Sequence, residues 1–162
     1  MTPQDLLAAG YRMGLRMVHM MCDDLTAEEF HHQPVEGANS AAWIVGHLAV
    51  VARWSAERLG ATDLPALSDG FRARYAATKS PAAIQTAHGG KEELLGLLDQ
   101  CIGKLIEEVK KLPDSSLERP PAFTGPFATN SAEGILFGSL HIMLHSGQLS
   151  TIRRSLGKPP LV

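Results

Sequence analysis

Apolar residues recur at helical spacing in four long stretches of the chain, and this periodicity limits the fold more than any other feature of the sequence. The stretches cover about 3–22, 40–59, 90–112 and 130–156. Side chains three and four positions apart share one face of a helix, so each stretch can turn a single apolar stripe toward a core. No stretch of the sequence shows the sustained alternation of apolar and polar residues that is typical of a half-buried strand. The sequence therefore predicts an all-α protein.

Residues at the ends of these stretches support the predicted helices. Asn39 or Ser40 can cap the second helix, and Gly60 ends it. Asn130 has the residue type and position of an N-cap for the last helix, and Gly157 ends that helix.

The connections between the helices are long. A crossover is expected at 61–89, with one short helix near 69–77, and a proline-rich connection at 113–129 cannot form continuous helix. Four long helices with long crossover connections predict a four-helix bundle. A chain of 162 residues is expected to form it as a single domain over 1–162.

The first helix carries an apolar stripe at alternating spacings of four and three residues. The stripe consists of Leu6, Gly10, Met13, Met17 and Met20. Methionine fills irregular gaps in apolar cores, and this spacing keeps the residues on one face. The stripe is therefore predicted to be the core seam of this helix.

Composition excludes several classes of protein. The net charge is −2 and no long basic run is present, which argues against nucleic acid as a partner. The longest apolar stretch, 41–52, is too short to span a bilayer, and the N-terminus lacks the pattern of a secretory signal. Cys22 and Cys101 lack C-x-x-C spacing and are expected to be reduced, buried thiols. The expectation is a cytoplasmic protein that binds neither nucleic acid nor membrane.

Three histidines lie on stripes that are expected to be buried. His141 and His145 are four residues apart in the last helix, and His47 lies in the middle of the apolar face of the second. Buried ring nitrogens need partners, and one divalent metal would satisfy all three rings together. Hydrogen bonds within the protein would satisfy them equally well. The spacing is a weak signal by itself, because no Glu follows the first histidine as in metalloprotease helices.

Glycines lie beside these histidines. Gly134 and Gly138 fall on the stripe of the last helix that carries the histidines, and Gly46 precedes His47. A glycine inside a helix costs about 1 kcal/mol relative to alanine. The sequence therefore predicts that another backbone approaches closely at these positions.

Other polar residues are weaker candidates. Gln148 can support His145 or pack at a helix contact, and its position favours the contact; Glu57 is a distant candidate for a general base. His31 and His32 are expected in a loop, one of them solvated, where they can border a pocket. The short segment around them cannot supply the ligands of a di-iron bundle. No carboxylate is placed beside the three histidines by the sequence.

Two stretches together resemble the DinB-like family. They are "SAAWIVGHLAVVARW" at 40–54 and "HIMLHSGQLSTIRRSLGKPP" at 141–160, and the pattern W-x-x-x-H-L followed by H-x-x-x-H-x-G-Q is specific in this order. The resemblance implies a four-helix bundle that holds a metal, typically nickel or zinc, on His47, His141 and His145. It also implies a homodimer.

The resemblance leaves the reaction open. Characterised members of the family include S-transferases that use the low-molecular-weight thiols bacillithiol, mycothiol or glutathione. Three neutral imidazoles leave a divalent metal with an open position, which can activate water or a thiol. The resemblance is therefore compatible with a metal-dependent hydrolase or thiol S-transferase. The alternative is a metal- or ligand-binding or stress-response bundle without enzymatic activity.

Overall fold

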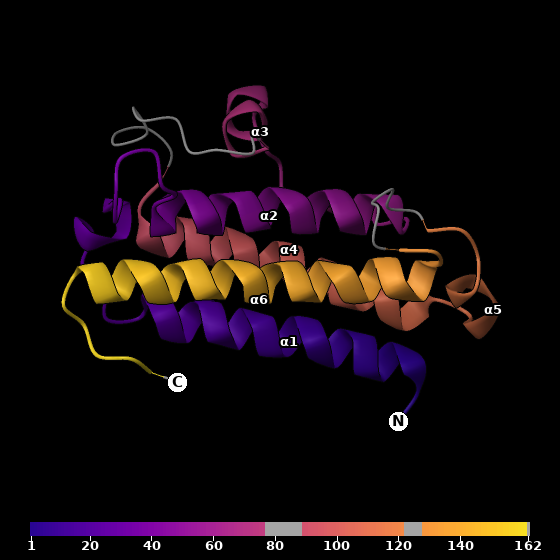
Figure 1. Ribbon diagram of the computed structural model, residues 1–162. Coiled ribbons are helices and arrows are strands. Elements are labelled where there is room, and N and C mark those ends of the chain that lie inside the picture. The colour runs from indigo at the N-terminus through magenta and orange to yellow at the C-terminus, as the bar shows by residue number, and fades with distance from the viewer. Residues whose placement is uncertain (77–88, 122–127, 162) are drawn as a thin grey trace.

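The computed structural model describes residues 1–76, 89–121 and 128–161 (Figure 1). Within these ranges the chain is helical and contains no strand, so the predicted all-α fold is confirmed. None of the helices in the described ranges is long and apolar enough to cross a membrane. Parts of the predicted connections, 77–88 and 122–127, lie outside the described residues. The helices are α1 (Pro3–Cys22), η1 (Glu29–His31, a 3₁₀ turn), α2 (Ala41–Arg58), α3 (Asp69–Tyr75), α4 (Lys91–Lys111), α5 (Asp114–Leu117) and α6 (Ser131–Ser155).

The ends of the long helices follow the predicted capping residues closely. The Ser40 side chain accepts a hydrogen bond from the Trp43 amide and caps α2, so Ser40 and not Asn39 is the N-cap. The Asn130 side chain accepts from the Glu133 amide and caps α6 in the same way. These caps satisfy amides that have no partner within the helix.

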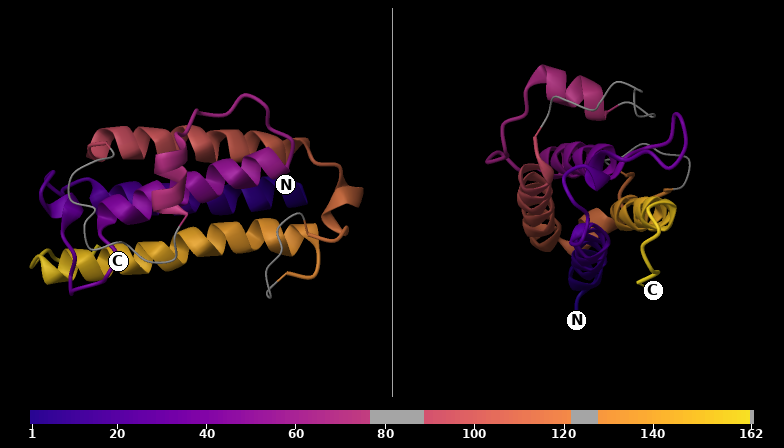
Figure 2. Two further views of the ribbon diagram at one scale, coloured as in Figure 1. Left: turned by 90° about the horizontal axis from the view of Figure 1, so that it is seen from above. Right: turned by 90° about the vertical axis from the view of Figure 1, so that its left-hand side faces the viewer.

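The four long helices form a bundle in which α1 and α6 are parallel neighbours. The Tyr11 hydroxyl donates to the Ile135 carbonyl near one end, and Arg153 donates to the Met21 carbonyl near the other. Viewed from the end, α1, α2, α4 and α6 occupy the four corners, and α3 stands outside α2 (Figure 2). This arrangement brings the middle of α2 beside the middle of α6.

The core between the helices is built from large apolar side chains. Cys22 and Cys101 are both buried and free, and burial raises the pKa of each thiol to about 12, as expected for unreactive thiols. The largest fully buried apolar and aromatic side chains are Trp43, Tyr75, Phe30, Ile44, Leu48, Leu94, Leu98, Ile102, Leu105, Ile135 and Leu149, and the charged side chain of Arg153 is buried as well.

The predicted core seam of α1 is wrong for its most exposed members, although Met17 packs against the edge of the core. Leu6 and Met13 are 64% and 61% exposed, whereas Leu7, Tyr11 and Val18 are buried. The helix carries two apolar stripes one residue apart, and a step of one residue rotates the buried face by about 100°. Small residues of both stripes pack closely against α6: an added Cβ would lie 2.9 Å from the Ile142 side chain at Gly14 and 2.8 Å from Ser139 Oγ at Gly10.

The glycines beside the histidines make room for tyrosine rings and not for a backbone. A Cβ on Gly138 would overlap the Tyr11 hydroxyl, and a Cβ on Gly46 would lie 2.5 Å from the Tyr75 ring. The prediction of a close approach at these two positions is therefore correct, but its assignment to backbone is wrong. Gly134 is buried in α6.

Replacing Gly138 by alanine is expected to destabilise the bundle. The new methyl group displaces the buried Tyr11 hydroxyl from the Ile135 carbonyl, which costs about 1–3 kcal/mol. Gly147→Ala on the same helix is the matched control. In the described part of the chain, nothing beyond its own stretch of helix lies within 4 Å of its added Cβ, so this substitution is expected to stabilise the protein by up to about 1 kcal/mol. Urea unfolding measures both changes, and equal effects of the two substitutions would contradict the packing at Gly138.

Candidate metal centre

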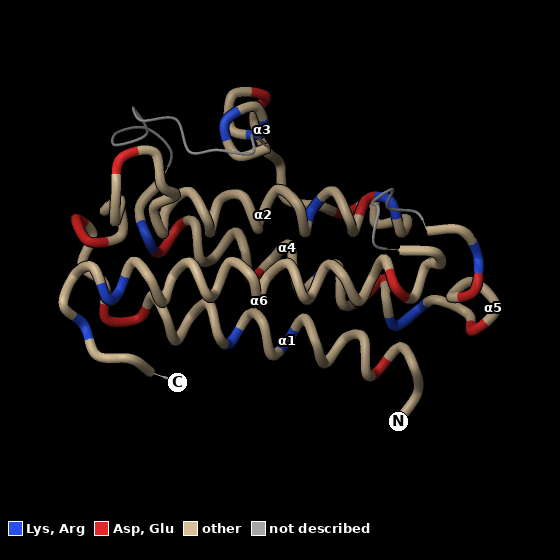
Figure 3. The backbone as a smooth tube through the Cα atoms, in the orientation of Figure 1, with Lys and Arg blue, Asp and Glu red and all other residues tan. Residues whose placement is uncertain are grey.

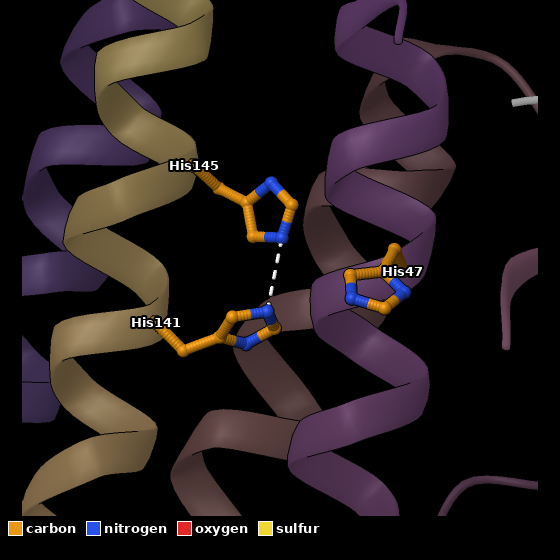
Figure 4. Close-up of side chains that lie close together, drawn as sticks. All are labelled: His47, His141 and His145. Atoms are coloured by element: carbon orange, nitrogen blue, oxygen red, sulfur yellow. Dashed lines mark hydrogen bonds between the residues drawn. The ribbon is translucent and has the colours of Figure 1, made fainter. Parts of the chain in front are cut away.

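Three histidines from two helices face one another inside the bundle (Figure 4). His47 comes from α2, and His141 and His145 come from successive turns of α6. Each offers one ring nitrogen, and these three nitrogens lie within 4.8 Å of one another. His145 is buried and the other two are half-buried. The structure thus brings together the three residues that the sequence singled out.

The spacing of the rings matches a small coordination site. The Nε2 atoms of His141 and His145 are 3.1 Å apart. The ring of His47 lies 5.3 Å from that of His141 and 5.1 Å from that of His145, centroid to centroid. Metal–nitrogen bonds of about 2.0–2.1 Å at tetrahedral angles place two ligand nitrogens roughly 3.3 Å apart. The pair on α6 already has this spacing, and the three nitrogens together, within 4.8 Å of one another, are close enough to converge on one divalent cation.

Hydrogen bonds fix which nitrogen of each ring is available. His47 Nδ1 lies 2.7 Å from the Tyr75 carbonyl, which can only accept, so Nδ1 carries the proton and Nε2 keeps its lone pair. His145 Nδ1 lies 2.9 Å from Gln148 Oε1 and donates to it in the same way. A hydrogen-bond partner at the ring nitrogen that does not bind the metal orients a ligating histidine and sets its tautomer.

Gln148 therefore supports His145, and its predicted role at a helix contact is wrong. The residue is exposed on α6, and its side-chain oxygen also lies 3.4 Å from Asn39 Nδ2. Three residues separate Gln148 from His145, so both side chains lie on one face of the helix. That spacing is compatible with either role. The His145 ring, which also contacts Trp43 and His47 of α2, turns its Nδ1 atom toward Gln148 and so decides between them.

The contact between His47 and α3 could not be foreseen from the sequence. Tyr75 is the last residue of α3, and carbonyls at a helix C-terminus lack partners within the helix. The Tyr75 ring packs over Gly46, which holds the Tyr75 carbonyl at His47. The one signal in the sequence is Gly46 itself, a glycine inside an otherwise apolar helix and next to a histidine.

An indole ring fixes the other side of His47. Trp43, one turn earlier on α2, stacks on His47 with ring centroids 4.7 Å apart and an interplanar angle of 9°. Trp43 is 1% exposed, so its ring cannot move aside without disturbing the core. His47 is thereby held between a carbonyl at its edge and an aromatic face.

The surroundings keep the three histidines neutral. Burial lowers the pKa of His47 and of His141, and burial together with the neighbouring His141 lowers the pKa of His145 to about 4. Neutral imidazole is the form that ligates metals. Among the residues that the structure describes, the cluster consists of these three histidines.

The metal-free protein is expected to lose stability as the pH falls from 6.5 to 4. In that window the unfolded chain protonates His145, whose ordinary pKa is 6.5, whereas the folded chain does not. The contribution of neutral His145 to the free energy of unfolding is fully present above pH 6.5, and about 2 kcal/mol of this contribution is lost between pH 7 and pH 5. Urea unfolding in a chelator at the two pH values measures the loss. His145→Gln should reduce this loss of stability. A free energy of unfolding that rises toward pH 5 would contradict the prediction.

The other candidate residues are not members of the cluster. Glu57 pairs with Arg53 at 3.2 Å. His31 and His32 are both half-buried, and His32 Nε2 lies 3.0 Å from Ser155 Oγ. The expectation that they border a pocket is confirmed, because they line a cavity of about 450 Å³ together with Glu28, Glu29 and Leu156.

Comparison with known families identifies a match over most of the chain. The family model described as the DinB superfamily matches residues 11–149, a span that includes all three histidines. No curated protein matches the chain.

Proposed function

The chain belongs to the DinB superfamily, and from this premise we propose that it is a metal-dependent enzyme whose divalent cation is held by His47, His141 and His145. The observation that carries the proposal is the convergence of three neutral ring nitrogens, two of them with tautomers set by hydrogen bonds. Nickel and zinc are the cations proposed, because both accept imidazole ligands.

Three protein ligands leave at least one coordination position open, which is the arrangement of catalytic sites. A bound divalent cation supplies Lewis-acid chemistry that favours the deprotonated form of a water or of a low-molecular-weight thiol. Hydrogen bonds to Tyr75 and Gln148 orient the rings of His47 and His145 and set their tautomers before a ligand binds.

Thiol S-transfer is the reaction type that this donor set favours, and hydrolysis is the second. Within the described part of the chain, the cluster itself includes no carboxylate. A thiol loses its proton more readily than water does, so it depends less on a general base. A non-catalytic metal-binding protein is the remaining alternative, and it differs from the enzyme only in turnover.

Metal content and turnover test the proposal in sequence. Protein purified without a nickel column should contain about one equivalent of a divalent metal, and chelation should lower its melting temperature. Bacillithiol, mycothiol and glutathione are then offered with an electrophilic fluorophore. Conjugation that is lost on chelation and restored by metal supports the S-transferase. A metal-free protein whose melting is unchanged by chelation contradicts the metal site. Bound metal without conjugation or ester hydrolysis favours the non-catalytic alternative.

We also propose that the protein forms a homodimer through the outer face of α1 and α6. On the exposed face of α1, the apolar residues Leu6, Met13 and Met20 repeat every seven positions. On the neighbouring helix α6, Leu140 is 55% exposed. Residues 134–152 of α6 include no Asp, Glu, Lys or Arg. In Figure 3 the middle of this helix is accordingly drawn without the colours of charged residues. A seven-residue apolar repeat suits packing against another helix, and a second copy offers the same face.

Met13→Glu is expected to weaken the dimer at least tenfold, because a two-fold interface would bury two unpaired carboxylates. Sedimentation equilibrium measures the dissociation constant. Gln100→Glu adds the same charge to an exposed position on α4 and should leave the association unchanged. A monomeric wild type, or equal effects of both variants, would contradict the proposed face.

A further inference from the structure

A pocket of about 330 Å³ lies beside the histidine cluster on the outer side of α2. His47 lines one part of it, so the pocket begins at a residue of the proposed metal centre. Its walls include the apolar side chains of Val50, Val51 and Leu67. A volume of this size and an apolar lining suit the body of a small molecule.

Two arginines in the pocket are held by backbone carbonyls. Arg53 Nε donates to the Pro65 carbonyl at 2.8 Å. Arg72 donates to the Leu67 carbonyl through Nε at 3.3 Å and through Nη2 at 3.2 Å. The two carbonyls belong to the segment that joins α2 to α3, so that segment fixes both guanidinium groups. A guanidinium that is already ordered loses less entropy when it binds an anion.

The pocket carries an excess of positive charge. Glu57 neutralises Arg53 in part, at 3.2 Å from its Nη1. Arg72 has no carboxylate within ion-pair distance in the described part of the chain, and carbonyls do not cancel its charge. An apolar pocket with an uncompensated guanidinium favours a ligand with an anionic group.

We infer that this pocket binds a small organic acid, with its apolar body against Val50, Val51 and Leu67 and its carboxylate on the guanidinium of Arg72. This ligand is a substrate or co-substrate of the reaction, and in that respect the inference rests on the proposed function. The pocket places the ligand next to His47. Arg72 is then a residue that determines specificity for acidic ligands.

Binding of hexanoate to the metal-free protein tests this assignment. The protein is treated with a chelator so that a carboxylate cannot be retained by a metal, and binding is followed by amide chemical shifts in NMR. Hexanoate is expected to shift amides of α2 and α3, and 1-hexanol, which has the same chain without the charge, should bind several-fold more weakly. Arg72→Gln should weaken hexanoate binding about threefold to tenfold. Higher salt should weaken it as well.

Arg74→Gln is the matched control, since it removes the same charge from the same helix at a position that does not line the pocket. It should leave hexanoate binding unchanged. Equal binding of hexanoate and 1-hexanol, equal effects of the two arginine variants, or binding that occurs only after metal is added would each overturn the inference. These measurements use metal-free protein, so a failure to bind hexanoate does not bear on the metal stoichiometry, which is measured separately. If the protein proves to bind no metal, hexanoate binding to the pocket can still be tested.

Discussion

Replacing His145 by alanine is expected to abolish stoichiometric binding of a divalent metal and to weaken metal affinity by about 100-fold or more. His145 is the most buried of the three histidines, and its Nε2 atom lies 3.1 Å from that of His141. Two remaining imidazoles cannot complete a three-nitrogen site, and loss of a direct ligand costs more than the 10–100-fold typical of an outer hydrogen-bond partner. Elemental analysis and a competition titration with a metal indicator measure the change.

Two further variants separate ligation from general effects of losing a histidine. His19→Ala removes a partly exposed histidine of α1 that pairs with Asp99, and it should retain one equivalent of metal. Gln148→Leu leaves all three ligands in place but removes the acceptor of His145 Nδ1, so affinity should fall by about 10–100-fold. Full metal content in folded His145→Ala would exclude the proposed site.

Replacing Trp43 by alanine is expected to cost about 3–5 kcal/mol of unfolding free energy. Trp43 is 1% exposed and is among the largest fully buried side chains of the bundle. Its removal leaves a cavity that the packed helices can close only in part. The ring also stacks on His47, so metal affinity should fall together with stability. Urea unfolding of the metal-free protein measures the first effect, and a metal titration measures the second.

Trp54→Ala provides the matched control on the same helix. Trp54 is 42% exposed, and its ring contacts the Arg58 guanidinium at 4.1 Å. Removing it is expected to cost about 1 kcal/mol or less and to leave the metal affinity unchanged. If the two tryptophan variants had equal stability, Trp43 would not have the structural role that its burial indicates.

Local signals predicted the helices of this protein well, because the caps and the apolar periods act within a few residues. Ser40 and Asn130 are the N-caps of α2 and α6, as their residue types indicate. The resemblance of the histidine pattern to the DinB-like family identified His47, His141 and His145, the three residues that lie close together in the structure. That these residues bind a metal stays a prediction, which His145→Ala tests.

Contacts between distant parts of the chain could not be predicted in the same way. Periodicity predicted an apolar stripe on α1 but selected the wrong one, because only packing against α6 distinguishes Leu7 and Tyr11 from Leu6 and Met13. The spacing of Gln148 placed it near His145 without showing the direction of the histidine ring. Such choices depend on surfaces that do not exist until the helices assemble.

The sequence by itself determined the helices, their ends and the identity of the three histidines, since period, capping chemistry and motif are properties of neighbouring residues. Only the tertiary structure decided what supports the histidines. The Tyr75 carbonyl reaches His47 from α3, across 28 positions of the chain, because Gly46 leaves space for the Tyr75 ring. A hydrogen bond of this kind depends on the packing of one helix against another, and short-range sequence patterns carry no record of that packing.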